Sequence, residues 1–145
     1  MPEFEILSVN ISESKGTVKK PVPELRLRID HGVEGDAHAG DWHRQVSLLG
    51  DESIDKMRAK GLELKPGDFA ENITTRGVEL FGLPVGTIIT IGECELEVTQ
   101  IGKECHAGCE IAKKVGSCVM PKEGIFAKVL IEGTISAEDR GHYNI

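Results

Sequence analysis

The side chains best suited to chemistry are three cysteines, Cys105, Cys109 and Cys118, which lie within 14 residues of one another. Cys105 stands between Lys103 and His106, after a predicted strand and just before a predicted helix. Positive charge and a helix N-terminus both lower the pKa of a thiol, because each stabilises the thiolate. We therefore expect Cys105 to be a nucleophilic or metal-binding cysteine.

The same segment allows a second interpretation, a zinc site. Thiolates and imidazoles are typical ligands of structural zinc, and the candidate donors are Cys105, His106, Cys109 and Cys118. Their spacing lacks the usual two ligand pairs, and two adjacent donors bind one ion with difficulty. The segment contains no Cys-x-x-Cys motif, which disfavours a thioredoxin-like redox pair. The fourth cysteine, Cys94, alternates with acidic residues in a predicted strand, and we expect it to be a small buried side chain.

A second chemical segment, residues 30–44, is rich in glycine and histidine and holds the only tryptophan. Its glycines let the backbone approach a ligand closely, and His38 and Arg44 offer donors suited to an anion such as phosphate. A metal bound between His38 and His43 is one alternative, but this spacing matches no recognised ligand pattern. A glycine-rich turn whose histidines only cap backbone groups is another.

Short strands must position both segments, because apolar residues recur with a period of two along most of the chain. Prolines in residues 19–23 predict a loop or an edge strand there. Many short strands and 17 glycines favour a closed or nearly closed β-barrel over alternating βαβ units. The expected fold class is β-rich α+β with two or three short helices. The predicted strands cover residues 4–11, 25–29, 45–49, 71–75, 87–91, 94–101 and 125–131, and the predicted helices cover 51–61 and 107–115.

Length and charge limit the domain count and the class of partner. A chain of 145 residues with 39% hydrophobic residues fits a single domain over residues 1–145. The net charge of −7 repels a phosphate backbone, so we expect no nucleic-acid partner. Apolar runs fall short of the roughly 20 residues that a membrane helix needs, and the first residues lack the positive charge of a signal peptide. We expect a cytoplasmic protein without a membrane partner.

Short motifs along nearly the whole chain occur in an order that resembles the MOSC domain, the family named after the C-terminal domain of molybdenum cofactor sulfurase. The resemblance is to stand-alone bacterial members and implies a barrel similar to the β-barrel of pyruvate kinase, in agreement with the predicted strands. The motifs are Gly32–His38, Arg44–Leu49, Pro66–Thr75, Val85–Thr87, Ile91–Gly92, and Leu96–Gln100 with the cysteine that follows.

The resemblance implies binding of molybdenum or of the molybdenum cofactor (molybdopterin), and carriage or transfer of sulfur through a cysteine persulfide. The implied activity is of the sulfurtransferase type. By its position after Thr99-Gln100, the family's cysteine corresponds to Cys105, which the resemblance makes both the catalytic residue and a molybdenum ligand. The implied cofactor-binding residues are Gly35, Asp36, His38, Arg44, Glu71, Asn72 and Lys103.

The chain departs from the family pattern after Gln100, where Ile101-Gly102 replaces the Pro-Arg pair of many relatives. Lys103 supplies a point charge there without the planar two-point grip of arginine. The chain is too short for the pyridoxal phosphate-dependent desulfurase of full-length sulfurases, so the resemblance implies pyridoxal phosphate only on a partner. The implied partners are a cysteine desulfurase or other sulfur donor and a molybdoenzyme acceptor. The alternatives are a non-catalytic cofactor carrier or sensor and a small zinc-stabilised domain.

Overall fold

The structure is a computed structural model that describes residues 2–13, 18–61, 63–102 and 123–144. The predicted helix over 107–115 lies outside these residues. The same holds for five of the chemical side chains, Lys103, Cys105, His106, Cys109 and Cys118.

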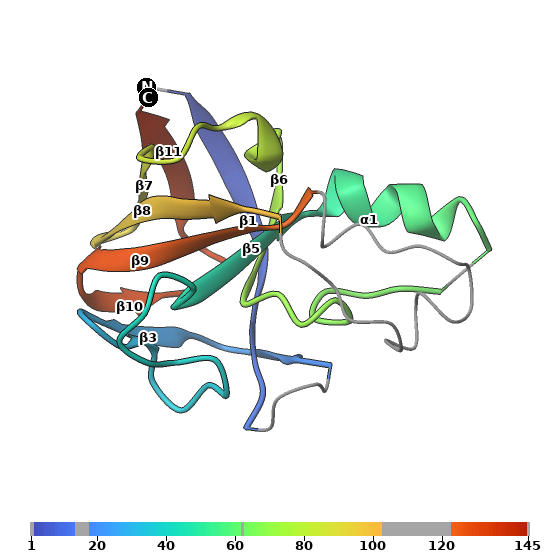
Figure 1. The fold of residues 1–145 in the computed structure, drawn as a ribbon. Coiled ribbons are helices and arrows are strands. Elements are labelled where there is room, and N and C mark those ends of the chain that lie inside the picture. Colours follow the sequence, from blue (N-terminus) through green and yellow to red (C-terminus); the bar gives the residue numbers. More distant parts are fainter. Residues whose placement is uncertain (1, 14–17, 62, 103–122, 145) are drawn as a thin grey trace.

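Within the described residues, seven strands close into a mixed β-barrel, which confirms the predicted fold class (Figure 1). The ring runs β11-β7-β8-β9-β5-β6-β1, and pairing of β1 with β11 closes it. Neighbouring strands are antiparallel except β5 and β6, which are parallel. The barrel strands are β1 (Glu3–Ile11), β5 (Val46–Gly50), β6 (Ile73–Arg76), β7 (Ile88–Ile91), β8 (Cys94–Ile101), β9 (Ile125–Ile131) and β11 (Arg140–Asn144).

Three further strands form a second sheet below the barrel in Figure 1, in the order β10 (Gly133–Ile135), β3 (Leu25–Arg28), β4 (Gly32–Val33). A short strand, β2 (Lys20–Val22), pairs only with β1, as an edge strand. This position agrees with the prolines of that segment, since proline cannot donate a hydrogen bond to a central ladder.

The barrel interior is filled by side chains that alternate along the strands. In β8, Cys94, Leu96 and Val98 are buried, while the glutamates between them are partly exposed. Cys94 is fully buried, as predicted. This burial raises the pKa of its thiol to about 11. Strand β5 is buried on both faces, because Val46 and Leu48 face the barrel core and Leu49 faces a second apolar cluster.

The second cluster lies between the barrel wall and helix α1 (Asp51–Arg58), and it unites Leu49, Ile54, Met57, Phe69 and Phe126. The helix follows β5 directly and projects from one side of the barrel (Figure 1). It ends three residues before the predicted boundary at Gly61. A 3-10 helix, η1 (Leu80–Gly82), adds one turn. Neither of these helices has the length and apolar character needed to span a membrane, and the described ranges contain no other that does.

Candidate functional site

The glycine- and histidine-rich loop ends against the last residues of β8. His43 donates from Nε2 to Gln100 Oε1 at 2.8 Å, and the Thr99 hydroxyl donates to the His43 carbonyl. The Gln100 amide in turn donates to the carbonyl of Gly102 at 2.7 Å. The barrel therefore brings the predicted anion-binding loop to the strand end that precedes Lys103 and Cys105 in the sequence.

Arg44 stacks between two aromatic rings at this junction. Its guanidinium carbon lies 4.5 Å from the centre of the Trp42 ring and 5.6 Å from that of Phe126. Phe126 pairs with Gln100 across β8 and β9, so the arginine lies beside the same strand end. The Arg44 Nε is buried and has no hydrogen-bond partner among the residues that the structure describes. Because a buried unpaired donor is costly, such an atom indicates a bound ligand or water.

A buried ion pair supports the middle of the loop. Lys19 Nζ lies 2.7 Å from Asp36 Oδ1, and both side chains are fully buried. The same ammonium donates to Ser12 Oγ at 3.1 Å and lies 3.1 Å from His38 Nδ1. Burial by itself raises the pKa of Asp36, but the hydrogen bond and charge of Lys19, with the Ser12 and His38 amides, outweigh it and lower the pKa below its usual value.

The loop backbone is held from several sides. Asp36 Oδ2 accepts the His38 amide at 3.1 Å, and the Trp42 indole donates to the His38 carbonyl at 2.9 Å. Gly35 takes a positive φ of 84°, a conformation that glycine adopts without strain. The nearest atom to a Cβ at Gly35 would be 3.7 Å away, so backbone conformation rather than space explains the glycine.

Glu71 and Asn72, in the turn that precedes β6, are fully buried. The Glu71 carboxylate accepts the amides of Gly67 and Phe69 at 3.1 and 3.2 Å, and burial raises its pKa against the opposing effect of those hydrogen bonds. The Asn72 side chain accepts the Ser47 amide at 3.0 Å and also donates to the β1 backbone. Both side chains thus bond to the chain itself, and ligand binding by either stays a prediction.

Lys19 connects the loop residues around His38 with the turn that Glu71 holds. Its side chain contacts His38, and its amide donates to the Gly67 carbonyl at 2.8 Å. Sequence reasoning missed Lys19 and Phe126, and it gave Gln100 no role beyond its place in a motif. No signal in the sequence separates Lys19 from the exposed Lys20 beside it, because the two differ only in the side of the chain to which they point.

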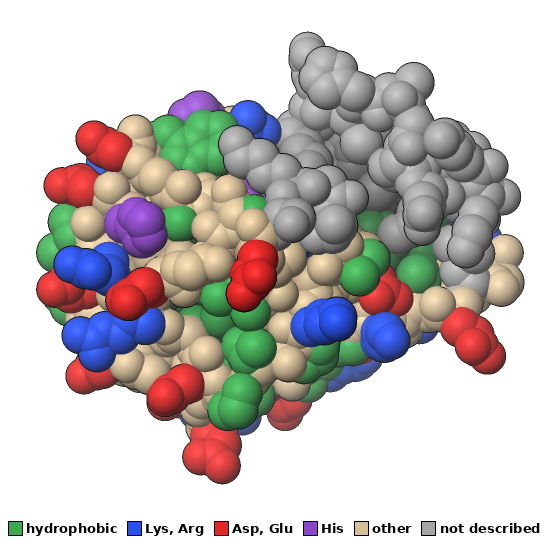
Figure 2. Space-filling view, turned by 90° about the horizontal axis from the view of Figure 1, so that it is seen from below, with side chains coloured by type: hydrophobic (Ala, Val, Ile, Leu, Met, Phe, Trp, Pro, Cys, Tyr) green, Lys and Arg blue, Asp and Glu red, His purple; other side chains and the backbone are tan. Residues whose placement is uncertain are grey.

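On the face shown in Figure 2, acidic and basic side chains are interspersed, and histidine side chains reach the surface. An anion on such a face must be held by specific donors rather than by a broad positive patch. Across the described ranges, no three His, Cys, Asp or Glu side chains are grouped to hold a metal ion. The alternative of a metal between His38 and His43 thus lacks a third ligand there.

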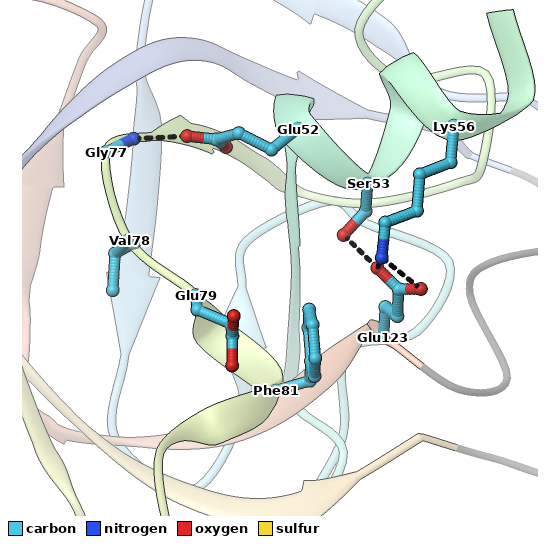
Figure 3. A pocket seen from close by; sticks show the side chains of 8 residues that line it. All are labelled: Glu52, Ser53, Lys56, Gly77, Val78, Glu79, Phe81 and Glu123. Atoms are coloured by element: carbon cyan, nitrogen blue, oxygen red, sulfur yellow. Dashed lines mark hydrogen bonds and ion pairs between the residues drawn. The ribbon is translucent and has the colours of Figure 1, made fainter. Parts of the chain in front are cut away.

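A separate pocket of about 320 Å³ lies between α1 and the segment that leads into η1 (Figure 3). Two of its charged groups pair with each other, since Lys56 Nζ lies 2.8 and 2.9 Å from the two Glu123 oxygens. Ser53 donates to the same carboxylate at 2.7 Å. None of the residues singled out from the sequence lines it. The lining residues are Glu52, Ser53, Lys56, Gly77, Val78, Glu79, Phe81 and Glu123.

Comparisons with known proteins agree on one fold. A family model described as the MOSC domain matches residues 34–140. The YUAD protein from Bacillus subtilis superposes with a TM-score of 0.82 at 18% identity, over 98% of this chain and 96% of that one. YiiM from Geobacillus stearothermophilus superposes with a TM-score of 0.72 at 21% identity, over 99% of this chain and 76% of that one. YiiM from Escherichia coli superposes with a TM-score of 0.71 at 20% identity, over 100% of this chain and 71% of that one. No curated protein matches the chain.

Proposed function

The chain belongs to the MOSC domain family, a family related to the molybdenum cofactor, and on that premise we propose that it binds this cofactor and carries or transfers sulfur through Cys105. The observation that carries the proposal is the contact between the glycine- and histidine-rich loop and the end of β8. His43 meets Gln100 at 2.8 Å, and Gln100 lies five residues before Cys105 in the sequence.

Chain length supports a shared site for the loop and the cysteine. Cys105 follows Gly102 by three residues, and three residues of extended chain reach at most about 11 Å. Gly102 is fixed to the barrel, since its amide donates to the Gly124 carbonyl at 2.7 Å. The covalent chain thus keeps the Cys105 backbone within about 11 Å of Gly102, which supports the proposal of a shared site.

The residues of the loop fit an anionic group. Arg44 has a buried Nε that lacks a partner, and a guanidinium binds phosphate through paired hydrogen bonds. In the proposal, Arg44, His38 and Lys103 hold the pterin phosphate. Gly35 and Asp36 shape the loop, and Glu71 and Asn72 hold the turn to which Lys19 connects it. Cys105 is the proposed ligand of molybdenum. When bound, the cofactor supplies a metal that accepts soft sulfur ligands.

The proposed sulfur step needs no external oxidant or reductant. The Cys105 thiolate attacks the terminal sulfur of a donor persulfide, and a new sulfur–sulfur bond forms on Cys105. The sulfur–sulfur bond of the donor breaks, and the donor leaves as a thiolate. A cysteine desulfurase, which carries the pyridoxal phosphate, is the proposed donor, and a molybdoenzyme is the proposed acceptor.

The test is incubation of the protein with a persulfide donor, followed by mass spectrometry of the cysteine peptides. We expect one added sulfur on the Cys105 peptide and none in the Cys105→Ser variant. Cys109→Ser and Cys118→Ser serve as matched controls and should take up sulfur as the wild type does. An unmodified Cys105 beside a modified Cys109 or Cys118 contradicts the proposal.

A non-catalytic cofactor carrier or sensor is the second candidate, and the unpaired Nε of Arg44 favours it, because binding through that atom requires no thiol. Molybdenum and pterin analysis of the purified protein distinguishes the two candidates. Molybdenum that is retained by Cys105→Ser but lost in Arg44→Ala indicates a carrier. Loss in Cys105→Ser indicates that the thiol takes part in binding.

A further inference from the structure

We propose that Lys19, held by Asp36, is a positioning residue that fixes the imidazole of His38 in the Nε2–H tautomer. The ring then offers a hydrogen-bond donor at Nε2, which suits an anionic oxygen and not a metal cation. The proposal relies on the proposed function only for the identity of that oxygen, which would belong to the cofactor phosphate. The tautomer itself follows from contacts within the chain.

The ammonium group of Lys19 has three hydrogen-bond donors and no acceptor. Lys19 Nζ lies 2.7 Å from Asp36 Oδ1, 3.1 Å from Ser12 Oγ and 3.1 Å from His38 Nδ1. Lys19 can therefore satisfy the contact with the ring only by donating to a lone pair on Nδ1. The neutral imidazole carries one proton, so that proton lies on Nε2.

The charge of Lys19 favours the same tautomer. Both members of the pair are fully buried, and a buried ammonium is stable only beside a countercharge. Asp36 supplies that charge, and its pKa lies below its usual value for the reasons given above. The pair thus places the positive charge of Lys19 beside the facing ring nitrogen, and that charge opposes a proton there.

Asp36 is not a hydrogen-bond partner for a protonated Nδ1. Asp36 Oδ2 lies 3.8 Å from that nitrogen, which is beyond hydrogen-bond distance. This oxygen already accepts the amide of His38 at 3.1 Å. Of Lys19 and Asp36, the cation therefore lies nearer to the ring nitrogen, at 3.1 Å against 3.8 Å.

The consequence concerns ligand specificity. The His38 side chain is 32% exposed, so part of the ring reaches the surface while Nδ1 faces the buried Lys19. A neutral histidine binds a metal through an unprotonated nitrogen, and in this tautomer the unprotonated nitrogen is already occupied. The Lys19–Asp36 pair therefore favours an anion over a metal ion at His38.

Long-range proton–nitrogen NMR correlation of the histidine rings tests the proposal directly, with ¹⁵N-labelled full-length protein at neutral pH and without cofactor. The His38 signals are assigned by their loss in His38→Gln. In the wild type we expect a protonated Nε2 and an unprotonated Nδ1, in a single tautomer. In the double variant K19M/D36N we expect a mixture in which the Nδ1–H tautomer appears beside the Nε2–H tautomer.

The double variant removes both buried charges together, so it leaves neither one buried without a partner. Lys20→Met, at the exposed neighbouring position, is the matched control and should leave the His38 signals unchanged. A protonated Nδ1 in the wild type overturns the proposal, and so does a pure Nε2–H form in a folded double variant. If the double variant does not fold, the wild-type spectrum decides alone. Failure of Cys105 to take up sulfur would not alter these spectra.

Discussion

Replacement of Arg44 by methionine should separate binding from stability. Methionine keeps a flexible apolar stem but removes the guanidinium that stacks on Trp42 at 4.5 Å and on Phe126 at 5.6 Å. It also removes the buried Nε that has no hydrogen-bond partner. If Arg44 is present to bind an anion, the variant loses affinity while the fold tolerates the change.

The magnitude follows from two opposing contributions to the free energy of unfolding. The lost cation–π contacts are worth about 0.5–1 kcal/mol each at a partly exposed site. The unpaired donor costs the wild type about 1–3 kcal/mol, which the variant regains. The free energy of unfolding should therefore change by between about −1 and +2 kcal/mol. A charge-assisted hydrogen bond contributes about 1.5–3 kcal/mol, so phosphate affinity should fall by about tenfold to a hundredfold.

The chain supplies its own reporter for this experiment. Trp42 is the only tryptophan, and it contacts Arg44 directly. Its fluorescence can follow a titration with inorganic phosphate, and the denaturant midpoint gives the free energy of unfolding.

Arg58→Met is the matched control, because the Arg58 guanidinium is held by partners within the chain. It lies 2.9 Å from Asp51 and 2.8 Å from Asp55, and its Nε donates to the Leu64 carbonyl at 3.1 Å. That variant should lose about 1 kcal/mol of unfolding free energy and keep its phosphate affinity. If Arg44→Met instead loses more than about 3 kcal/mol and binds phosphate as the wild type does, Arg44 is a packing residue and the reasoning fails.

Four other predictions follow from the described residues. Because the folded pKa of Asp36 lies below 3.8, its contribution to stability is complete above pH 3.8 and is lost as the pH falls through the folded pKa. The stability difference between the wild type and K19M/D36N should thus narrow below pH 3.8 in acid unfolding, and a constant difference would contradict this. With a pKa of about 11 and a buried side chain, Cys94 should resist alkylation at pH near 8 in the folded protein and react only after unfolding, as measured by peptide mass spectrometry. Gly32→Ala should be more destabilising than Gly86→Ala in denaturant titrations, although both positions have a positive φ. The added Cβ would meet a backbone oxygen at 2.5 Å at Gly32, whereas nothing lies within 4 Å at Gly86, where strain of about 1–2 kcal/mol remains. Chelator should leave the melting temperature unchanged, and a large decrease would instead favour the zinc-stabilised alternative.

Most of the barrel could be predicted, because alternation of apolar side chains is a local property. The pattern in β8 predicted both the strand and the burial of Cys94, and the prolines near β2 predicted an edge. Strands β4 and β10 were missed, since two or three residues are too short to show a period. Strand β11, with the sequence RGHYN, was missed because it is mostly polar and is held by backbone pairing to β1 and β7.

The candidate site was only partly predictable. Residue types and motif order identified the loop around His38 and Arg44. They did not reveal that Lys19 is buried beside Asp36 while Lys20 is exposed. They also gave no reason to expect Phe126 beneath the Arg44 guanidinium, since that contact depends on the pairing of β8 with β9.

The amino-acid sequence by itself determined the family, the strand-rich fold class and the types of side chain available for binding, because these depend on composition, local periodicity and motif order. The tertiary structure decided which of those side chains meet. His43 and Gln100 are separated by 57 positions in the chain and come within 2.8 Å only because the barrel closes with one register. Closure also buries Lys19 against Asp36 and His38. The buried ammonium requires the negative charge of Asp36, and it makes Nδ1 of His38 the ring nitrogen that accepts a hydrogen bond.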